Sequence, residues 1–227
     1  MVQSVPRPFQ QHTPTEDLLQ QKEQHVARGV HATHPIFVLE ARNSLVKDVD
    51  GKIYIDFTSG IGATNAGHSN PHVVHAVKHQ MDHFTHTCFT ASHYENYVKV
   101  CEQLNDLVPI RGQAKSALFT TGAEAVENAI KIAKVATGRK GVISFEHGFH
   151  GRTLMTMSLT AKIKPYKKGF GPFAPEVYKL PYPYLYRRPR GMSEDAYVKS
   201  LLDDIEENFF VDVVDPEDVS CLVMEPV

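Results

Sequence analysis

The chain has 227 residues, of which 24 are basic and 26 acidic, and 42% of its residues are hydrophobic. This length suits one or two domains with a sizeable core, and the net charge of −2 excludes a global field that would favour nucleic acid or an anionic membrane. Three cysteines, Cys88, Cys101 and Cys221, have no paired spacing, which argues against a secreted disulfide framework and predicts a cytoplasmic protein. No basic segment with an apolar core opens the chain, and no apolar run reaches about 18 residues, so neither an export signal nor a membrane span is expected.

The N-terminal part is predicted to be a tail followed by a helix. Residues 1–12 are polar and contain prolines, which is typical of a mobile tail. Thr13 is a suitable N-cap, Pro14 fits the first helical position and Glu16 completes a capping box. Gly29 is placed to end this helix.

A hairpin and two further helices are expected next. Short β-type runs between residues 37 and 57 flank Asp50-Gly51, a pair that favours a tight hairpin turn. Asn70-Pro71 predicts the start of a helix that reaches about Phe84. Ser92 and Glu95 have the spacing of a capping box for another helix, which reaches about Leu107.

After Pro109, strand-type and helix-type segments alternate. Such alternation predicts a mostly parallel sheet covered by helices. The predicted elements are strand 116–120, helix 123–137 closed by Gly138, strand 141–145, helix 194–209 and strand 219–224.

The helix predicted over 123–137 is amphipathic. Glu127 and Lys131 are spaced to form a favourable ion pair one turn apart. The face expected to pack on the sheet holds Val126, Ala129, Ile130 and Ala133.

Residues 162–192 are rich in proline, tyrosine and basic side chains. This composition favours a long surface loop or a subunit contact. Aromatic rings interleaved with arginine can also stack on nucleic-acid bases, but the rest of the chain offers no basic face, so this alternative is the weaker one.

The segment 118–132 turns from a strand-like run through Gly122 directly into a helical run. A helix begins with backbone N–H groups that lack intrahelical partners and with the positive end of its dipole, so this turn can bind a phosphate. Gly122 has no Cβ and allows a ligand close to the backbone, and Thr121 adds a hydroxyl. A second segment, 145–153, places an aromatic residue between glycines and ends on Arg152-Thr153, which supplies a flat stacking surface and a carboxylate-binding fork.

Together with Asp56-Phe57-Thr58-Ser59-Gly60-Ile61-Gly62 and Met224-Glu225-Pro226-Val227, these two segments resemble motifs of the class III aminotransferases. Within that family the likeness is greatest to the 4-aminobutyrate-type enzymes. It runs in order from about Pro35 to Val227 and covers only half of such an enzyme.

The resemblance implies the N-terminal half of an enzyme that uses pyridoxal 5'-phosphate to move the terminal amine of 4-aminobutyrate to 2-oxoglutarate. The implied fold is the α/β large domain of fold type I pyridoxal-phosphate-dependent transferases, with a mostly parallel sheet, flanking helices and an absent C-terminal domain. Residues 1–57 are expected to belong to the small domain and residues 58–227 to a partial large domain. Such enzymes act on small amino acids and 2-oxo acids as homodimers or homotetramers.

The resemblance also assigns cofactor-binding residues. Gly122 and Ala123 match the phosphate-binding backbone, with Thr121 beside them, and Phe149 matches the aromatic ring stacked on the cofactor. Glu225 matches a glutamate near the cofactor, where its expected task is to orient other groups. Phe149 could instead be an ordinary core residue.

Two residues are expected to bind the substrate. Arg152 matches the arginine that holds the substrate carboxylate far from the reacting amine, because a guanidinium binds a carboxylate through two parallel hydrogen bonds. Ile61 matches a position that lines the substrate pocket. A structural ion pair for Arg152 and a turn or core role for Ile61 are the alternatives.

The chain lacks several motifs of the family. The aspartate facing the pyridine nitrogen, the Schiff-base lysine and a second arginine have no counterpart in these residues. We therefore predict no catalytic residue, and we expect that the 227-residue chain by itself does not catalyse transamination.

Other functions remain open. His72, His75 and His79 share one helical face, and His147 and His150 are close in sequence, but no cysteine or carboxylate completes a recognisable metal set. The alternatives are another ω-amino-acid aminotransferase, acting on ornithine, N-acetylornithine or 5-aminovalerate, and a non-catalytic protein that binds a phosphate-bearing ligand or a partner.

Overall fold

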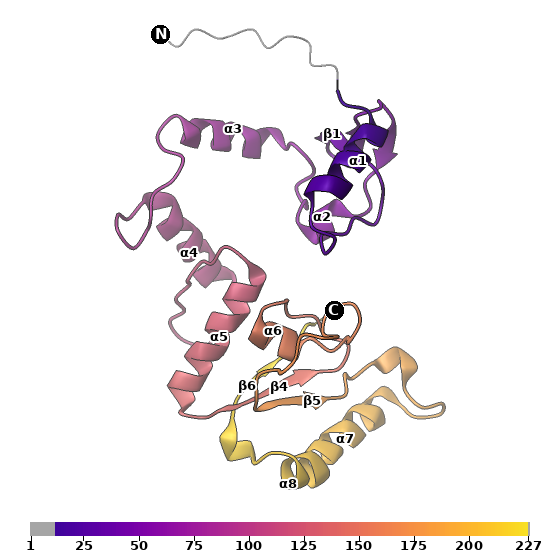
Figure 1. Ribbon diagram of the computed structural model, residues 1–227. Coiled ribbons are helices and arrows are strands. Elements are labelled where there is room, and N and C mark those ends of the chain that lie inside the picture. The colour runs from indigo at the N-terminus through magenta and orange to yellow at the C-terminus, as the bar shows by residue number, and fades with distance from the viewer. Residues whose placement is uncertain (1–11, 227) are drawn as a thin grey trace. The chain divides into compact units, whose positions relative to one another are not determined.

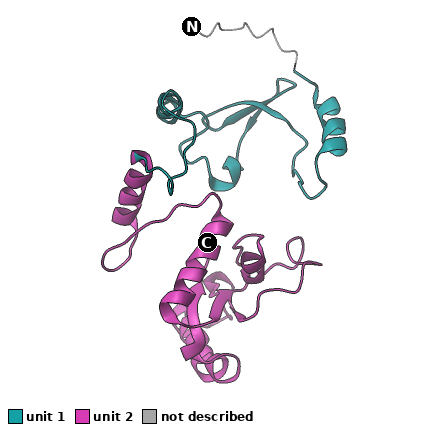
Figure 2. Ribbon diagram, turned by 60° about the vertical axis from the view of Figure 1, so that its left-hand side comes forward, with its two compact units in different colours: residues 1–94 teal, residues 95–227 magenta. Residues whose placement is uncertain are grey.

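The computed structural model describes residues 12–226, so the predicted tail lies outside the described residues except for His12. The chain forms two compact units, Met1–Tyr94 and Glu95–Val227, each of which is described by itself (Figure 2). No helix in the described residues is long and apolar enough to cross a membrane. The sequence-based division at residue 57 concerns the domains of a larger protein and stays a prediction.

The first unit begins with the helix α1, Thr15–His25. Its N-cap is Pro14, so the capping box predicted on Thr13 is wrong, and the N–H of Thr15 instead donates to Asp50 Oδ1 at 3.2 Å. The helix also ends before Gly29, because Val26 already adopts an extended backbone.

A three-stranded antiparallel sheet follows, formed by β1 (Val38–Arg42), β2 (Leu45–Asp48) and β3 (Ile53–Ile55) in that order. The predicted turn at Asp50-Gly51 is confirmed, because it joins β2 to β3 and Gly51 has a φ of 87°. The buried Asp48 carboxylate holds this turn by accepting the N–H groups of Asp50 and Lys52 and the hydroxyl of Tyr54.

Two helical segments complete the first unit. The short α2, Ser59–Gly62, is a left-handed turn in which all four residues have positive φ. The helix α3, Pro71–Met81, confirms the predicted start, since the Asn70 side chain accepts the N–H groups of His72 and Val73.

The second unit is built from strands that alternate with helices. Its principal elements are α4 (Glu95–Leu107), α5 (Gly122–Thr137), β4 (Gly141–Phe145), α6 (Leu154–Leu159), β5 (Val177–Leu180), α7 (Glu194–Asp204) and β6 (Val219–Val223). Shorter helical turns are η1 (Leu185–Arg187), η2 (Ile205–Phe209), α8 (Phe210–Asp212) and η3 (Pro216–Asp218). Gly138 closes α5 in the left-handed conformation, as predicted.

The three strands of this unit form a parallel sheet with the order β5-β4-β6, which confirms the predicted α/β fold (Figure 1). Every residue of the central β4 is buried. On one face, Val142 packs with Ile130 of α5 and Leu159 of α6. On the other face, Ile143 packs with Phe209 from the π-helical turn η2 that continues α7.

In the second unit, four expectations differ from the structure. Residues 116–120 form no strand, because the N–H of Leu118 donates to the Tyr97 hydroxyl and the carbonyl of Ser116 accepts the Cys101 thiol, both on α4. The strand β5 forms inside the proline-rich segment that was expected to be loop. The predicted helix 194–209 is α-helical only to Asp204.

The fourth difference concerns Glu127 on α5. Its carboxylate does not pair with Lys131 but accepts the Thr153 hydroxyl at 2.6 Å and the N–H of Met155 at 3.2 Å. The Lys131 ammonium donates to Asn128 Oδ1. Glu127 therefore joins α5 to the start of α6, a contact that helical spacing alone cannot indicate.

Candidate functional site

The start of α5 is a well-capped helix N-terminus. Thr121 is its N-cap, and its hydroxyl accepts the N–H of Glu124 at 3.1 Å. The Glu124 carboxylate accepts the N–H of Thr121 at 3.0 Å, which completes a capping box. This box is not among the predicted features, although Thr121-Gly122-Ala123-Glu124 is its usual sequence pattern.

Two donors at this helix start are left for a ligand. The capping box uses the N–H groups of Thr121 and Glu124, and the N–H of Ala125 donates to the carbonyl of Thr121. Within the described residues, the N–H groups of Gly122 and Ala123 form no hydrogen bond. A Cβ on Gly122 would meet no atom within 4 Å, so no other part of the second unit is packed against that side of Gly122. Two free N–H groups at the positive end of a helix dipole are suited to an anion.

The loop that follows β4 lies against this helix start. Gly151 has a φ of 128°, and a Cβ placed on it would lie 2.9 Å from the Cβ of Ala123 and 2.6 Å from the Thr156 hydroxyl. Only glycine allows so close an approach, so Gly151 brings its neighbours Phe149 and Arg152 to the N-terminus of α5.

Phe149 lies in this loop with 42% of its surface exposed, which excludes an ordinary core position. Its ring packs against Tyr166, with ring centres 4.9 Å apart and planes tilted by 57°. Its N–H donates to Glu225 Oε2 at 2.9 Å. Glu225 follows β6, so this carboxylate joins the carboxyl ends of β4 and β6 and holds the backbone that carries the Phe149 ring.

Arg152 is exposed and directly precedes Thr153, the N-cap of α6. Among the described residues it forms no ion pair, so its guanidinium is not taken up by a structural carboxylate. All of its donors are therefore available to a carboxylate ligand.

Ile61 belongs to the first unit and is described with it. It is 98% exposed and has a φ of 59°, which is a strained conformation for a β-branched residue. Asp56 holds the turn that carries it, because Asp56 Oδ1 accepts the N–H groups of Thr58 and Ser59. Ile61 is thus no core residue, and the other six predicted site residues lie in the second unit.

His150, which lies between Phe149 and Gly151, is not among the predicted site residues. This side chain is buried, its Nε2 has no hydrogen-bond partner in the described residues, and its backbone N–H donates to Thr160 Oγ1 at 3.0 Å. Burial lowers the pKa of His150, and the charge of Lys179 lowers it further while Glu225 opposes the shift. A histidine beside the proposed aromatic residue was a visible signal, but its burial depends on the packed loop.

The described residues contain no group of three or more histidine, cysteine, aspartate or glutamate side chains that could hold a metal ion. A profile of the family described as aminotransferase class-III matches residues 25–227. The chain belongs to the class-III aminotransferase family.

Three relatives illustrate this membership. The chain is 46% identical over 208 residues to a probable 4-aminobutyrate aminotransferase of Bacillus subtilis, covering 92% of this chain and 48% of the relative. It is 55% identical over 162 residues to a 4-aminobutyrate aminotransferase of Mycobacterium bovis, covering 71% of this chain and 36% of the relative. It is 45% identical over 212 residues to a 5-aminovalerate aminotransferase of Pseudomonas putida, covering 93% of this chain and 48% of the relative. This class-III aminotransferase chain thus spans about half the length, or less, of these curated relatives.

Solved structures show the same fold. The taurine:2-oxoglutarate aminotransferase of Bifidobacterium kashiwanohense, in complex with pyridoxal 5'-phosphate and glutamate, matches with a TM-score of 0.83 at 24% identity, over 94% of this chain and 48% of that chain. An (S)-enantioselective omega-transaminase of Thermomicrobium roseum also matches with a TM-score of 0.83 at 24% identity, over 93% of this chain and 49% of that chain. The predicted fold class is therefore confirmed.

Proposed function

We propose that this class-III aminotransferase chain supplies the phosphate-binding and ring-binding part of an enzyme that moves the terminal amine of 4-aminobutyrate to 2-oxoglutarate with pyridoxal 5'-phosphate. The observation that carries the proposal is the pair of free N–H groups at Gly122 and Ala123, which lies beside the loop that bears Phe149 and Arg152. The 4-aminobutyrate aminotransferases among the relatives support the choice of amino donor.

The residues present fit the cofactor. The N–H groups of Gly122 and Ala123 bind its phosphate, and the Thr121 hydroxyl keeps its own proton for donation because it accepts from Glu124. The half-exposed ring of Phe149 offers a face to the pyridine ring. The Glu225 carboxylate keeps Phe149 in place by accepting a hydrogen bond from the backbone N–H of Phe149. When bound, pyridoxal phosphate supplies the electron sink for the chemistry at the amino carbon.

Arg152 selects the substrate in this proposal. The unpaired guanidinium of Arg152 binds the carboxylate of 4-aminobutyrate through two hydrogen bonds and thereby orients the molecule. Ile61, in the first unit, stays a proposed substrate contact by resemblance alone, with an exposed apolar side chain. The acceptor is 2-oxoglutarate, and we propose that the full-length enzyme is a cytoplasmic homodimer or homotetramer.

A second candidate is an aminotransferase for 5-aminovalerate, which the 45% identical relative of Pseudomonas putida favours. The two substrates differ by one methylene, and an apolar pocket separates such homologues by only about 10-fold to 200-fold. The ratio of kcat/KM for 4-aminobutyrate and 5-aminovalerate, measured on a full-length enzyme that carries this chain, decides between them.

The cofactor site can be tested on the 227-residue chain with the variant Gly122→Pro. Proline is tolerated at the first position of a helix and removes one N–H group, and Thr121 already has the extended backbone that a following proline requires. We expect the chain to bind pyridoxal phosphate more tightly than pyridoxal, and the variant to lose about 10-fold or more of that preference, since a hydrogen bond to a charged group contributes about 1.5–3 kcal/mol.

The comparison with pyridoxal is the control, because it lacks only the phosphate. The unchanged chain and the Gly122→Pro variant should bind pyridoxal with the same affinity. Equal affinities of the unchanged chain for the two compounds, measured by absorbance titration, would overturn the proposed phosphate site.

A further inference from the structure

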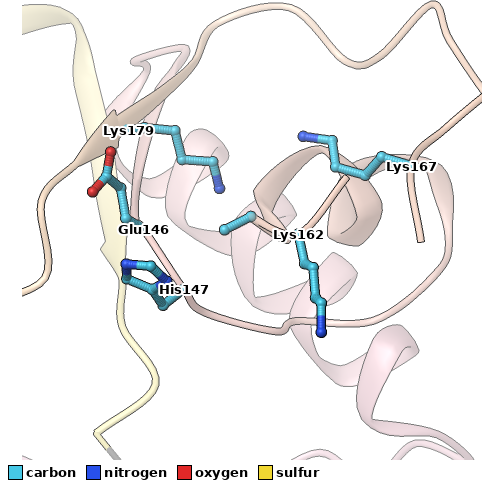
Figure 3. Close-up of a pocket in the computed structure, with 6 residues that line it drawn as sticks. Glu146, His147, Lys162, Lys167 and Lys179 are labelled. Atoms are coloured by element: carbon cyan, nitrogen blue, oxygen red, sulfur yellow. The ribbon is translucent and has the colours of Figure 1, made fainter. Parts of the chain in front are cut away.

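A cavity of about 720 Å³ lies at the carboxyl ends of β4 and β5 in the second unit (Figure 3). Glu146 and His147 directly follow β4, and Lys179 is the last but one residue of β5. The carboxyl ends of parallel strands are where α/β sheets bind ligands. Its lining residues are Glu146, His147, Ala161, Lys162, Lys167 and Lys179, and none of them belongs to the proposed cofactor or substrate site.

The Lys179 ammonium is held inside this cavity. It donates to the Ser144 hydroxyl at 2.8 Å and to the carbonyl oxygen of Leu159. An ammonium group has three donors, so one N–H remains for a ligand. The two bonds to the protein fix the position of the nitrogen before any ligand arrives.

Lys167 brings a second ammonium group. Its Nζ lies 4.8 Å from the ring centre of Phe173 and, within residues 12–226, makes only a long hydrogen bond, of 3.5 Å, to the carbonyl of Ser158. In Figure 3 the ammonium groups of Lys167 and Lys179 point toward each other, whereas that of Lys162 points away.

The positive charges of these two lysines are held in no ion pair in the described part of the chain, although the Glu146 carboxylate lines the same cavity. Burial lowers the pKa of Lys167. Burial, together with the charge of Lys167, lowers the pKa of Lys179 to about 8, against the opposing effect of the Glu146 carboxylate. Two facing cations in a partly desolvated cavity repel each other, and an anion between them would remove that repulsion.

We propose that this cavity binds a small oxyanion, a phosphate or a carboxylate group, between the ammonium groups of Lys167 and Lys179. Lysine is a compact point charge with three rotatable donors, which suits tetrahedral phosphate as well as carboxylate. The site is separate from the helix start at Gly122, which we assign to the cofactor phosphate.

The site can be tested by acetylating the 227-residue chain with a limiting amount of reagent. Mass spectrometry then measures the rate of acetylation at each lysine. Inorganic phosphate and succinate are added in separate arms, and sodium chloride of equal ionic strength is the reference. Only the neutral amine reacts, and a nearby opposite charge raises a lysine pKa by about one unit or more. We therefore expect the oxyanion to slow the labelling of Lys167 and Lys179 about 10-fold, in a saturable manner.

Lys162 and Lys168 provide internal controls. Lys162 points away from the other two ammonium groups, and Lys168 is exposed and does not line the cavity. Equal slowing of these two lysines would show a general ionic effect and overturn the proposal, as would no slowing of Lys167 and Lys179. Protection in the phosphate arm alone identifies a phosphate site, and protection in the succinate arm alone identifies a carboxylate site.

Variants separate this site from its surroundings. Lys167→Met should abolish the protection of Lys179, and Lys168→Met should leave it unchanged. Because loss of Lys179 could disturb the packing around Ser144, Lys167→Met is the preferred variant, with circular dichroism as a check on folding. Gly122→Pro should leave the protection intact, and a loss of protection in that variant would place the anion at the start of α5 and refute the cavity.

Discussion

Gly151 shows at the level of one residue how the loop after β4 reaches the start of α5. A methyl group there would collide with the Thr156 hydroxyl and the Ala123 methyl, and its φ of 128° is unfavourable for any residue with a Cβ. We expect Gly151→Ala to lower the free energy of unfolding by about 3 kcal/mol, from overpacking and backbone strain together. Urea denaturation measures this loss.

Gly122→Ala is the matched control for Gly151→Ala. Its added methyl would meet nothing within 4 Å, and its backbone is not left-handed. Its stability should stay within about 0.5 kcal/mol of the unchanged chain. Similar losses in both variants would mean that the loop does not pack on α5.

Asp56 holds the turn that carries Ile61 in the first unit. The Thr58 hydroxyl, His68 at 2.7 Å and the N–H of Ser59 keep the pKa of Asp56 well below its ordinary value of 3.8. A carboxylate with a lowered folded-state pKa stabilises the protein above the ordinary pKa, and this contribution is lost as the pH falls below it.

We therefore expect Asp56→Asn to be less stable than the unchanged chain at neutral pH. The difference should narrow as the pH falls below about 3.8, because the unfolded chain then binds a proton at Asp56 while the folded chain keeps the carboxylate charged, which favours unfolding of the unchanged chain. Urea denaturation of both proteins at several pH values tests this. A difference that persists undiminished in acid would show that the charge of Asp56 does not stabilise the turn.

At the level of an element, α5 depends on its N-terminal cap. The Thr121 hydroxyl accepts the N–H of Glu124, so Thr121→Ala leaves that donor without its partner. We expect a loss of about 1 kcal/mol in the free energy of unfolding. Thr13→Ala should change it by less than about 0.5 kcal/mol, because Thr13 does not cap α1. Equal losses in thermal or urea denaturation would contradict the assigned capping positions.

At the level of the whole molecule, large apolar side chains remain on the surface of both units. Those with the most exposed surface include Phe57, Ile61, Leu107, Val135 and Val211. Exposed apolar surface of this extent favours association. We expect the 227-residue chain to bind a hydrophobic dye and to aggregate as its concentration rises, as measured by light scattering.

Val135→Glu should reduce that aggregation without lowering stability, because Val135 is 86% exposed on α5. Ile130→Glu would instead unfold the second unit, since Ile130 is buried against β4. A monodisperse monomer that unfolds reversibly would contradict the prediction of aggregation.

Local sequence signals determined the hairpin at Asp50-Gly51, the start of α3, the length of α5 and the strands β4 and β6. Each of these features depends on turn chemistry, capping or hydrophobic pattern within a few residues, so it can be predicted from the local sequence alone. The family and the candidate site residues were also predicted from ordered motifs. The family match over residues 25–227 confirms the family.

Only the tertiary structure decided the features that depend on distant partners. Residues 116–120 are strand-like in sequence, but their backbone groups bond to side chains of α4 and form no strand. Glu127 bonds to Thr153 on the next helix instead of Lys131 one turn away. The link between Glu225 and Phe149 joins segments far apart in the chain, and the burial of His150 and the facing ammonium groups of Lys167 and Lys179 likewise depend on tertiary packing. Local propensity acts over one or two turns, whereas these contacts form only when the chain folds, and the link between Glu225 and Phe149 forms only after the parallel sheet has brought the carboxyl ends of β4 and β6 together.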